Sequence, residues 1–348
     1  MAAEGPGQLR CLPLDEVTRP AWDDYARGKR EAWLPHLADW SLKIVPALGH
    51  ECRSFMVIDG EGKVRGLVPL GLRRSRLFGA SLVSVPGASW AGPLAEEGGA
   101  LEAITEELVR QAREARVKFV EIRDGERLPE PFGVTAGYLR FPISLGPGLD
   151  APVPDERTRR RLKKAHKAGV RAVLVSPDRD EFHDIYARAM ARLGSPALGR
   201  EFFRALASAF GEELRVVLVE AGGAVVAVDL VGFWNGLGCS LFAGATDVGR
   251  GVQADLIAIE AGLAAAVSRG CHTFDLGRSP AGSGGQTFKL HWKPQAVPLG
   301  YQHLRNGCGA PPDLNPDRVL WRAARTVWRL FPLWFQARLG PSIARQLL

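Results

Sequence analysis

The stretch Ala224–Phe242, AVVAVDLVGFWNGLGCSLF, predicts more about the fold than any other part of the chain. Its two apolar runs, Ala224–Phe233 and Gly238–Phe242, flank the pair Asn235-Gly236. Both residues of an Asn-Gly pair tolerate a positive φ angle, which favours a tight turn between antiparallel strands. The stretch therefore predicts a β-hairpin.

The residues on either side extend this hairpin into a larger unit. The apolar run Leu214–Glu220 predicts a strand before it, separated by the turn residues Gly222-Gly223. Val252–Ser268 predicts a helix, and Gly270 follows where a glycine commonly ends one. Cys271–Leu276 then predicts a closing strand, so the unit reads as an antiparallel meander, a crossover helix and a further strand.

The first part of the chain carries a similar series of segments. Ser54–Ile58, Lys63–Leu70 and Ser81–Val85 predict strands, residues 99–116 predict an amphipathic helix, and Val117–Arg123 predicts the closing strand. The two closing strands lie about 155 residues apart. The order of elements predicts an α/β fold with mixed sheets, built from two similar halves.

A Pro- and Gly-rich run, residues 142–154, is the expected linker between the halves. Helices are expected at residues 155–169, 180–193 and 200–210, before the second meander. We therefore divide the chain into an N-terminal half at residues 1–150, a C-terminal half at 155–306, and a basic amphipathic tail at 313–348.

The composition is that of a globular cytosolic protein. Of the 348 residues, 46% are hydrophobic and 24% charged, and the net charge is +7. The five cysteines form no CxxC pair, which favours neither a disulfide framework nor a zinc site, and no metal is expected. The first residues show no basic run followed by an apolar one, so secretion is not expected, and no stretch is apolar enough to predict a membrane span.

The basic residues are concentrated in two segments. Eight Lys or Arg residues lie between Arg157 and Arg171, which suits either a solvated helix or one that contacts tRNA. Six Arg residues lie between Arg318 and Arg345, several of them on one helical stripe opposite apolar residues. This tail either binds an anionic membrane surface or packs back on the domain.

The segment Phe274–Trp292, FDLGRSPAGSGGQTFKLHW, carries the main candidate site. A charged residue at the end of a buried strand, followed by a glycine-rich loop, is a common position for a ligand in α/β folds. Asp275 and Lys289 are candidate catalytic residues, and the candidate substrate-binding residues of the segment are Arg278, Ser279, Ser283 and Trp292. The alternative is a structural ion pair between Asp275 and Arg278.

A second candidate region follows the hairpin. The exit Ala245–Gln253 leads into a helix, where exposed N–H groups can bind a pyrophosphate. Its candidate cofactor-binding residues are Thr246, Gly249, Arg250 and Gly251, and the run loosely resembles the coenzyme A loop of GNAT acetyltransferases. Asp229, on a meander strand, is a further candidate base; the alternative is a strand carboxylate with a structural role.

Short motifs along most of the chain resemble FemAB-type proteins, particularly the subgroup associated with exosortase and exopolysaccharide loci. The resemblance runs from about residue 22 to residue 301, and similarity returns at residues 339–343. The matching motifs are Trp33–Leu37, Gly66–Leu70, Arg74–Pro86, Gly92–Leu94, Gly194–Pro196, Arg269–Ser279, Gly282–Gly284, Phe288-Lys289 and Trp292.

This resemblance implies tandem GNAT folds that transfer an acyl or aminoacyl group to an amine. It connects Lys289 with substrate phosphate or the transfer step and places Arg278 in the same signature. Trp90, in Trp90-Ala91-Gly92, replaces the aromatic-Gly-Gly of the family and marks a candidate acceptor groove. The long helical hairpin of tRNA-using members is absent near residue 200.

The leading hypothesis is a GNAT-type N-acyltransferase that uses acyl-CoA and acts on an amine of a cell-envelope or exopolysaccharide precursor, at the inner face of the membrane. One alternative is a FemAB-type transferase that uses aminoacyl-tRNA to extend peptidoglycan precursors. The other is a scaffold recruited to the membrane that has kept the fold without the activity.

Overall fold

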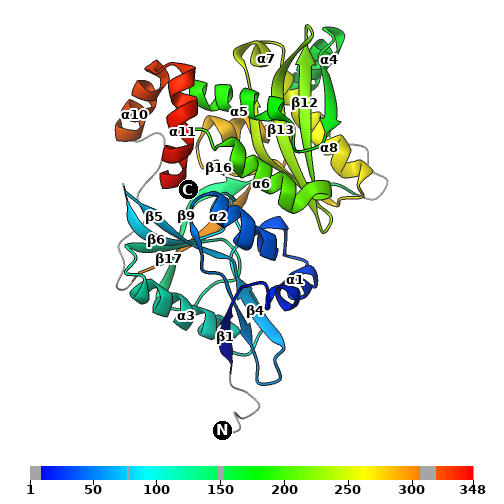
Figure 1. Ribbon diagram of the computed structural model, residues 1–348. Helices are drawn as coiled ribbons and strands as arrows, with labels where there is room; N and C mark the ends of the chain where they lie inside the picture. The colour runs from blue at the N-terminus through cyan, green and yellow to red at the C-terminus, as the bar shows by residue number, and fades with distance from the viewer. Residues whose placement is uncertain (1–8, 77, 147–152, 306–318, 348) are drawn as a thin grey trace. The chain divides into compact units, whose positions relative to one another are not determined.

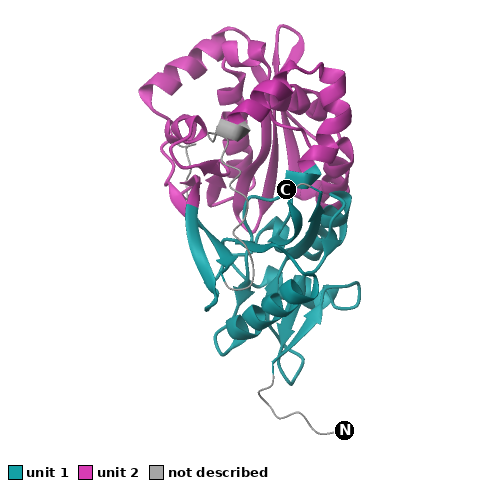
Figure 2. Cartoon of the chain, turned by 90° about the vertical axis from the view of Figure 1, so that its left-hand side faces the viewer, with its two compact units in different colours: residues 1–136, 299–313, 345–348 teal, residues 137–298, 314–344 magenta. Residues whose placement is uncertain are grey.

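The computed structural model (Figure 1) describes residues 9–76, 78–146, 153–305 and 319–347. The chain divides into two compact units, coloured teal and magenta in Figure 2. Unit 1 comprises residues 1–136, 299–313 and 345–348, and unit 2 comprises residues 137–298 and 314–344. The first boundary therefore lies before the expected linker, and unit 1 takes up the chain again after residue 298.

Unit 2 is built on a mixed sheet with the strand order β10-β15-β14-β13-β12-β11. Neighbours from β11 to β14 are antiparallel, whereas β15 runs parallel to β14. Asn235 and Gly236 both have positive φ angles, 49° and 75°, and the predicted hairpin is confirmed. The strands are β10 (Pro142–Ser144), β11 (Arg171–Val175), β12 (Leu214–Ala221), β13 (Ala224–Trp234), β14 (Leu237–Ala245) and β15 (Thr273–Asp275).

Helices pack on this sheet, and the one that crosses from β14 to β15 is apolar on nearly all sides. That helix, α8, contacts β12, β13 and β14 and also the helices α4 and α7, which explains why its sequence has no polar face. The predicted helices at 180–193 and 200–210 are confirmed. The helices of this part of unit 2 are α4 (Glu156–Lys167), α5 (Asp180–Leu193), α6 (Arg200–Phe210), α7 (Asp247–Gly251), α8 (Ala254–Ser268) and α9 (Gly284–Leu290).

Unit 1 repeats the central connection of unit 2. β5 (Leu70–Ser75) and β6 (Gly79–Ser84) are antiparallel, α3 (Ala100–Glu114) follows, and β8 (Phe119–Arg123) returns parallel to β6. The series β13, β14, α8 and β15 has the same directions. The predicted repeat of strand pair, crossover helix and parallel strand is therefore confirmed.

The first meander differs from the prediction. β3 (Phe55–Ile58) and β4 (Val64–Val68) belong to one sheet with β1 (Arg10–Pro13) and β7 (Leu94–Ala95), while β5 and β6 belong to another. Pro69 stands between β4 and β5 and has no backbone N–H to continue a ladder. The chain therefore changes sheets at this point, and the single meander predicted for the first half is wrong.

The expected linker is also partly wrong. Its residues 142–144 form β10, which pairs antiparallel with β15, whereas residues 147–152 lie outside the described part of the chain. The remaining elements are α1 (Arg19–Arg27), α2 (Val45–Ala47), β2 (Glu51–Cys52), β9 (Phe132–Arg140), β16 (Ser279–Pro280), β17 (Val297–Leu304), α10 (Val319–Leu330) and α11 (Leu333–Leu347).

Candidate active site

The sheet of unit 2 opens between its two parallel strands. Leu237, Gly238 and Cys239 of β14 pair with Thr273–Asp275 of β15, and the pairing ends there although β14 continues to Ala245. At Gly277 the chain turns with a φ of 75°, and a Cβ on this residue would lie 2.8 Å from the Ser240 carbonyl oxygen. Gly277 covers the carbonyl oxygen of Ser240, and beyond this residue β14 pairs with no described strand on the side that faced β15.

A β-bulge lies at this same point. Val231 of β13 pairs with Ser240, but the preceding residue Leu230 pairs with Phe242, so Leu241 has no opposite residue. A bulge leaves the extra residue outside the ladder and redirects the groups around it, and bulges are common next to active sites. Backbone N–H groups near Leu241 are thus candidates to polarise a substrate carbonyl.

Asp229 lies beside the bulge in the interior of unit 2. The residue is 1% exposed, and its Oδ1 accepts a hydrogen bond of 2.9 Å from the Ser240 hydroxyl. Its Oδ2 is buried and has no hydrogen-bond partner among the described residues. Burial raises the pKa of Asp229 to about 7, against the opposing effects of the Ser240 hydrogen bond and the Lys289 charge. A carboxylate with a pKa near neutrality suits a base.

Lys289 lies on α9 and points back to the turn after β15. Its Nζ donates hydrogen bonds of 2.8 Å to the carbonyl oxygens of Gly277 and Arg278, and it lies 5.3 Å from the ring centroid of Phe141. Burial lowers the pKa of Lys289 to about 8, although the charges of Asp275, Cys239 and Asp229 act in the opposite direction. The lysine therefore fixes the turn and supplies positive charge next to two buried carboxylates.

Asp275 holds the other end of the same turn. It is fully buried, and its Oδ1 accepts hydrogen bonds from the backbone N–H groups of Phe141, at 3.2 Å, and Gly277, at 2.8 Å. Arg140 Nη1 lies 3.9 Å from its Oδ2. Burial raises the pKa of Asp275, and the positive charge of Arg140 is the largest of the effects that lower it. The contacts of Asp275 thus connect β15 with the segment before β10, and its ion pair is with Arg140.

The glycine-rich segment is partly helical, which the sequence did not predict. Ser283 begins α9 by accepting a hydrogen bond from Gln286 N at 3.3 Å, and its hydroxyl donates to Pro280 O at 2.7 Å. Ser279 is buried in β16, where it pairs with Leu139. The guanidinium of Arg278 lies 4.7 Å from the ring centroid of Tyr138. The short helix explains why Lys289 reaches back to the turn.

Two predicted tryptophans lie in different surroundings. Trp292 is buried at the end of α9, lines a cavity of about 480 Å³ between α4 and α8, and its Nε1 has no hydrogen-bond partner among the described residues. Trp90 belongs to unit 1, where it is buried and stacks on Trp33 with a centroid separation of 4.4 Å.

The predicted cofactor loop forms the short helix α7. Thr246 caps it, accepting from Gly249 N at 3.0 Å and donating to Val226 O at 3.1 Å. Gly249 packs so closely that a Cβ would lie 2.3 Å from Val226 O, whereas a Cβ on Gly251 would meet nothing within 4 Å. Arg250 is exposed. Of the two glycines, only Gly251 therefore leaves its backbone open for a ligand to approach.

These two glycines give a matched pair of variants. We expect Gly249→Ala to lower the free energy of unfolding by about 1–3 kcal/mol, because the new methyl group overlaps a backbone oxygen. Gly251→Ala should leave it unchanged or raise it by about 0.5–1 kcal/mol, because the residue is helical with open space beside it. Chemical denaturation of both variants measures this. Equal stabilities would contradict the packing role of Gly249.

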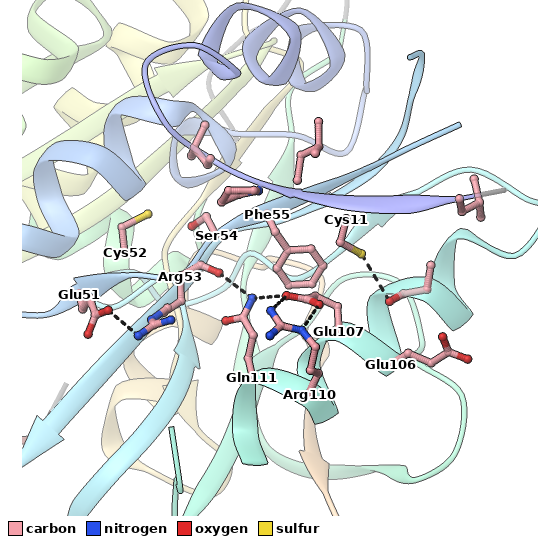
Figure 3. Close-up of a pocket in the computed structure, with 15 residues that line it drawn as sticks. Cys11, Glu51, Cys52, Arg53, Ser54, Phe55, Glu106, Glu107, Arg110 and Gln111 are labelled. Carbon is pink, nitrogen blue, oxygen red and sulfur yellow. Dashed lines mark hydrogen bonds and ion pairs between the residues drawn. The ribbon is translucent and has the colours of Figure 1, made fainter. Parts of the chain in front are cut away.

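A cavity lined by described residues of unit 1 contains no comparable reactive group. It measures about 740 Å³, and Figure 3 shows that both of its arginines contact carboxylates. Arg110 pairs with Glu107 at 2.7 Å, and Arg53 pairs with Glu51 at 2.6 Å. Burial raises the pKa of the Cys11 thiol to about 12, so this sulfur is a poor nucleophile.

Sequence reasoning missed three parts of the site: Ser240, Arg140 and the bulge at Leu241. Ser240 was detectable as a lone hydroxyl in an apolar strand, but its contact with Asp229 depends on the bulge, which has no sequence signature here. Among the described residues, no group of three or more His, Cys, Asp or Glu side chains is placed to hold a metal ion. Nor is any described helix long and apolar enough to cross a membrane.

Comparison with known proteins agrees with this geometry. Residues 155–292 match the family model described as an acetyltransferase (GNAT) domain. This range includes the site residues of unit 2 named above, apart from four that precede it: Tyr138, Leu139, Arg140 and Phe141. No protein of curated function matches the chain.

Several solved structures are similar over most of the chain. FemX has a TM-score of 0.63 at 12% identity, covering 86% of this chain and 98% of FemX. A tandem GNAT protein from the clavulanic acid biosynthesis pathway has a TM-score of 0.56 at 15% identity, covering 87% and 100%. The C-terminal domain of a lysylphosphatidylglycerol synthetase from Agrobacterium fabrum has a TM-score of 0.54 at 12% identity, covering 83% and 92%.

At these identities the structural likeness shows the fold, and the family match assigns the domain in unit 2. Residues 155–292 match an acetyltransferase (GNAT) domain, and the chain shares its fold with FemX and with a tandem GNAT protein.

Proposed function

We propose that this protein transfers an acyl group from acyl-CoA to an amine of a cell-envelope or exopolysaccharide precursor. The observation that carries the proposal is the opening between β14 and β15, with a bulge at Leu241 and the Ser240–Asp229 hydrogen bond beside it. The family match supports the donor, because GNAT domains typically use acyl-CoA. The acceptor class rests on the resemblance to the envelope-associated FemAB subgroup.

The residues present fit such a donor. Acyl-CoA supplies a thioester carbonyl, and N–H groups of β14 near Leu241 can donate hydrogen bonds to its oxygen as negative charge develops. The short helix α7, directly before α8, carries Arg250 and the open backbone of Gly251, and the Arg161 guanidinium donates to Gln253 at the start of α8. Together these groups favour a phosphate at this end of the helix.

Transfer requires an uncharged amine and a path for its proton. The amine nitrogen bonds to the carbonyl carbon, the carbon–sulfur bond breaks, and coenzyme A leaves as the thiolate or thiol. In our proposal the Ser240 hydroxyl takes the proton of the attacking amine while its own proton passes to Asp229. Asp229 is a positioning base that acts through Ser240, and Lys289 holds the turn beside it.

Aminoacyl-tRNA is the other donor to be tested. Three arginines of the basic helix α4 already have partners within unit 2: Arg159 and Arg160 pair with Glu156, and Arg161 contacts Gln253. Glu156 offsets part of the positive charge of α4, whereas the neutral Gln253 leaves the charge of Arg161 unchanged. Positive charge alone does not distinguish RNA from other anions, so the structure gives no specific support for tRNA, and acyl-CoA remains the donor we propose.

Free-thiol release tests the proposal directly. The purified chain is mixed with a panel of acyl-CoA donors and amine-bearing envelope precursors, and thiol is measured with and without acceptor. We expect acceptor-dependent release that Ser240→Ala lowers by about 100-fold. No release across the panel would refute the acyl-CoA proposal. Transfer from aminoacyl-tRNA instead would assign the alternative donor, and absence of both, together with unchanged cellular function of Lys289→Ala and Arg278→Ala, would favour a scaffold.

The pH dependence of kcat/KM follows from the two shifted groups of the free protein. Asp229 must be deprotonated to accept a proton, so kcat/KM should rise through pH about 7, where its carboxyl loses its own proton. Lys289 should act protonated, so kcat/KM should fall as pH passes about 8. We expect a narrow bell with these two limbs. Asp229→Asn should lose the acidic limb; a wild-type profile that is flat from pH 6 to 9 would contradict both assignments.

A further inference from the structure

The last two helices of unit 2 expose an unusual number of large apolar side chains. Leu330 is 80% exposed and Trp334 is 69% exposed, and both lie at the corner where α10 meets α11. Among the described side chains of these helices, the other large apolar ones that are exposed are Val327, Phe331, Leu333 and Leu339. We call these six residues the apolar corner. So many exposed large apolar side chains on one short segment are rare on a surface that faces only water.

Aromatic contacts give the corner a fixed shape. Phe331 stacks on Phe335 with a centroid separation of 4.6 Å, and Trp334 meets the edge of Phe335 at 5.7 Å. Trp328 lies 6.1 Å from Phe331 in an edge arrangement. Pro332 separates the two helices, and the Gln336 side chain donates to Phe331 O at 2.7 Å across the bend. The exposed rings are therefore held by their neighbours.

The opposite side of the helices is attached to unit 2. Arg325 Nε and Arg329 Nη2 both donate to the carbonyl oxygen of Leu193, at 2.9 and 3.2 Å. Gly340 packs against Ala197, and Gln336, Gly340 and Ala344, spaced four apart, are buried. The tail thus packs on unit 2 through these residues, with α10 beside α5 (Figure 1).

The positive charge of α10 and α11 favours an anionic partner. Residues 319–347 contain five arginines, Arg322, Arg325, Arg329, Arg338 and Arg345, and no Asp or Glu. Exposed apolar and aromatic side chains flanked by arginines are suited to the boundary between lipid head groups and acyl chains. A second copy of the chain is a poorer partner, because two surfaces of the same positive charge would face each other.

We propose that the apolar corner docks unit 2 on an anionic lipid membrane. With 12 and 15 residues, α10 and α11 are each too short to cross a bilayer, which needs about 20. They instead lie in the interfacial region, where Trp334 and Leu330 insert and the net positive charge of the segment attracts anionic head groups. This surface is separate from the residues proposed for catalysis, so the proposal stands or falls independently of the acyl donor.

Vesicle cosedimentation of the full chain tests the proposal. We expect binding to vesicles that contain phosphatidylglycerol and phosphatidylcholine, and at least tenfold weaker binding to vesicles of phosphatidylcholine alone. The variant Leu330→Ser/Leu333→Ser/Trp334→Ser should bind the anionic vesicles at least tenfold more weakly. Val17→Ser, at an exposed apolar residue of unit 1, is the matched control and should bind like the wild type. Raising the salt should weaken binding, because it screens the arginines.

The outcomes separate the membrane from other partners. Thermal unfolding of the triple variant must match that of the wild type, so that weaker binding reports the surface and not the fold. Absence of wild-type binding to anionic vesicles, or equal binding by the triple variant, would overturn the proposal. So would self-association in sedimentation experiments that the triple substitution abolishes, since the apolar corner would then join two copies of the chain.

Discussion

Replacing Asp229 with Asn should lower kcat by about 10²–10⁴-fold, the usual contribution of a general base. Asn keeps the size of the side chain and an oxygen that can accept from the Ser240 hydroxyl, now 2.9 Å away, but it cannot take up a proton. Steady-state kinetics at pH 7.5 with saturating donor measures the change. Asp178→Asn, at an exposed carboxylate of the same unit, is the control and should retain wild-type activity.

The same substitution should stabilise the fold at pH 8. The carboxyl group has its ordinary pKa near 3.8 in the unfolded chain and about 7 in the folded one, so the unfolded state releases its proton first as pH rises. The free energy of unfolding therefore falls between about pH 4 and pH 7. Asn does not titrate, so at pH 8 the variant should have a free energy of unfolding about 1–3 kcal/mol higher than that of the wild type. A variant that is less stable and equally active would show that Asp229 has a structural role.

Replacing Lys289 with Met should lower kcat/KM by about 100-fold or more and also destabilise unit 2. Methionine fills a similar volume but leaves the carbonyl oxygens of Gly277 and Arg278 without the donor that now lies 2.8 Å from each. Each unsatisfied buried acceptor costs about 1–3 kcal/mol, so we expect a loss of about 2–4 kcal/mol after partial relaxation. Kinetics and chemical denaturation together measure both effects.

Lys293→Met is the matched control, because Lys293 is exposed four residues later. It should change neither activity nor stability measurably. The role of Lys289 would be wrong if Lys289→Met also behaved like the wild type. If stability fell while kcat/KM at a temperature well below unfolding stayed unchanged, Lys289 would serve the fold alone.

Much of the fold could be predicted from the sequence because its signals are local. Asn235-Gly236 requires two positive φ angles, and the spacing of Gly270 after an apolar run marks the end of α8. The repeat in the first half could also be predicted from the order of its elements. The change of sheet at Pro69 could not be predicted. The missing N–H of proline interrupts a strand, but it does not determine which strands pair on either side of the interruption.

The candidate site was only partly predictable for the same reason. The sequence singled out Asp229, Asp275 and Lys289 separately, but their proximity depends on the parallel pairing of β14 with β15 and on the turn at Gly277. Asp275 was expected next to Arg278, whereas the structure pairs it with Arg140, a residue from β9 more than a hundred positions away. Long-range contacts of this kind leave no periodic signal in the chain.

The tail was predicted either to bind a membrane or to pack on the domain. The structure shows packing through Gln336, Gly340 and Ala344 and leaves the apolar corner exposed, so the two alternatives are compatible. This combination could not be predicted from a stripe of arginines, because Arg325 and Arg329 donate to a carbonyl of α5 on the side that packs.

The central claim is that the opening between β14 and β15 receives the thioester of acyl-CoA. A crystal structure of the chain with a non-hydrolysable acyl-CoA analogue tests it most directly. We predict that the carbonyl oxygen of the analogue lies within hydrogen-bond distance of a β14 backbone N–H near Leu241, next to Ser240. An analogue bound away from this opening, or no binding at concentrations that support thiol release, would contradict the claim.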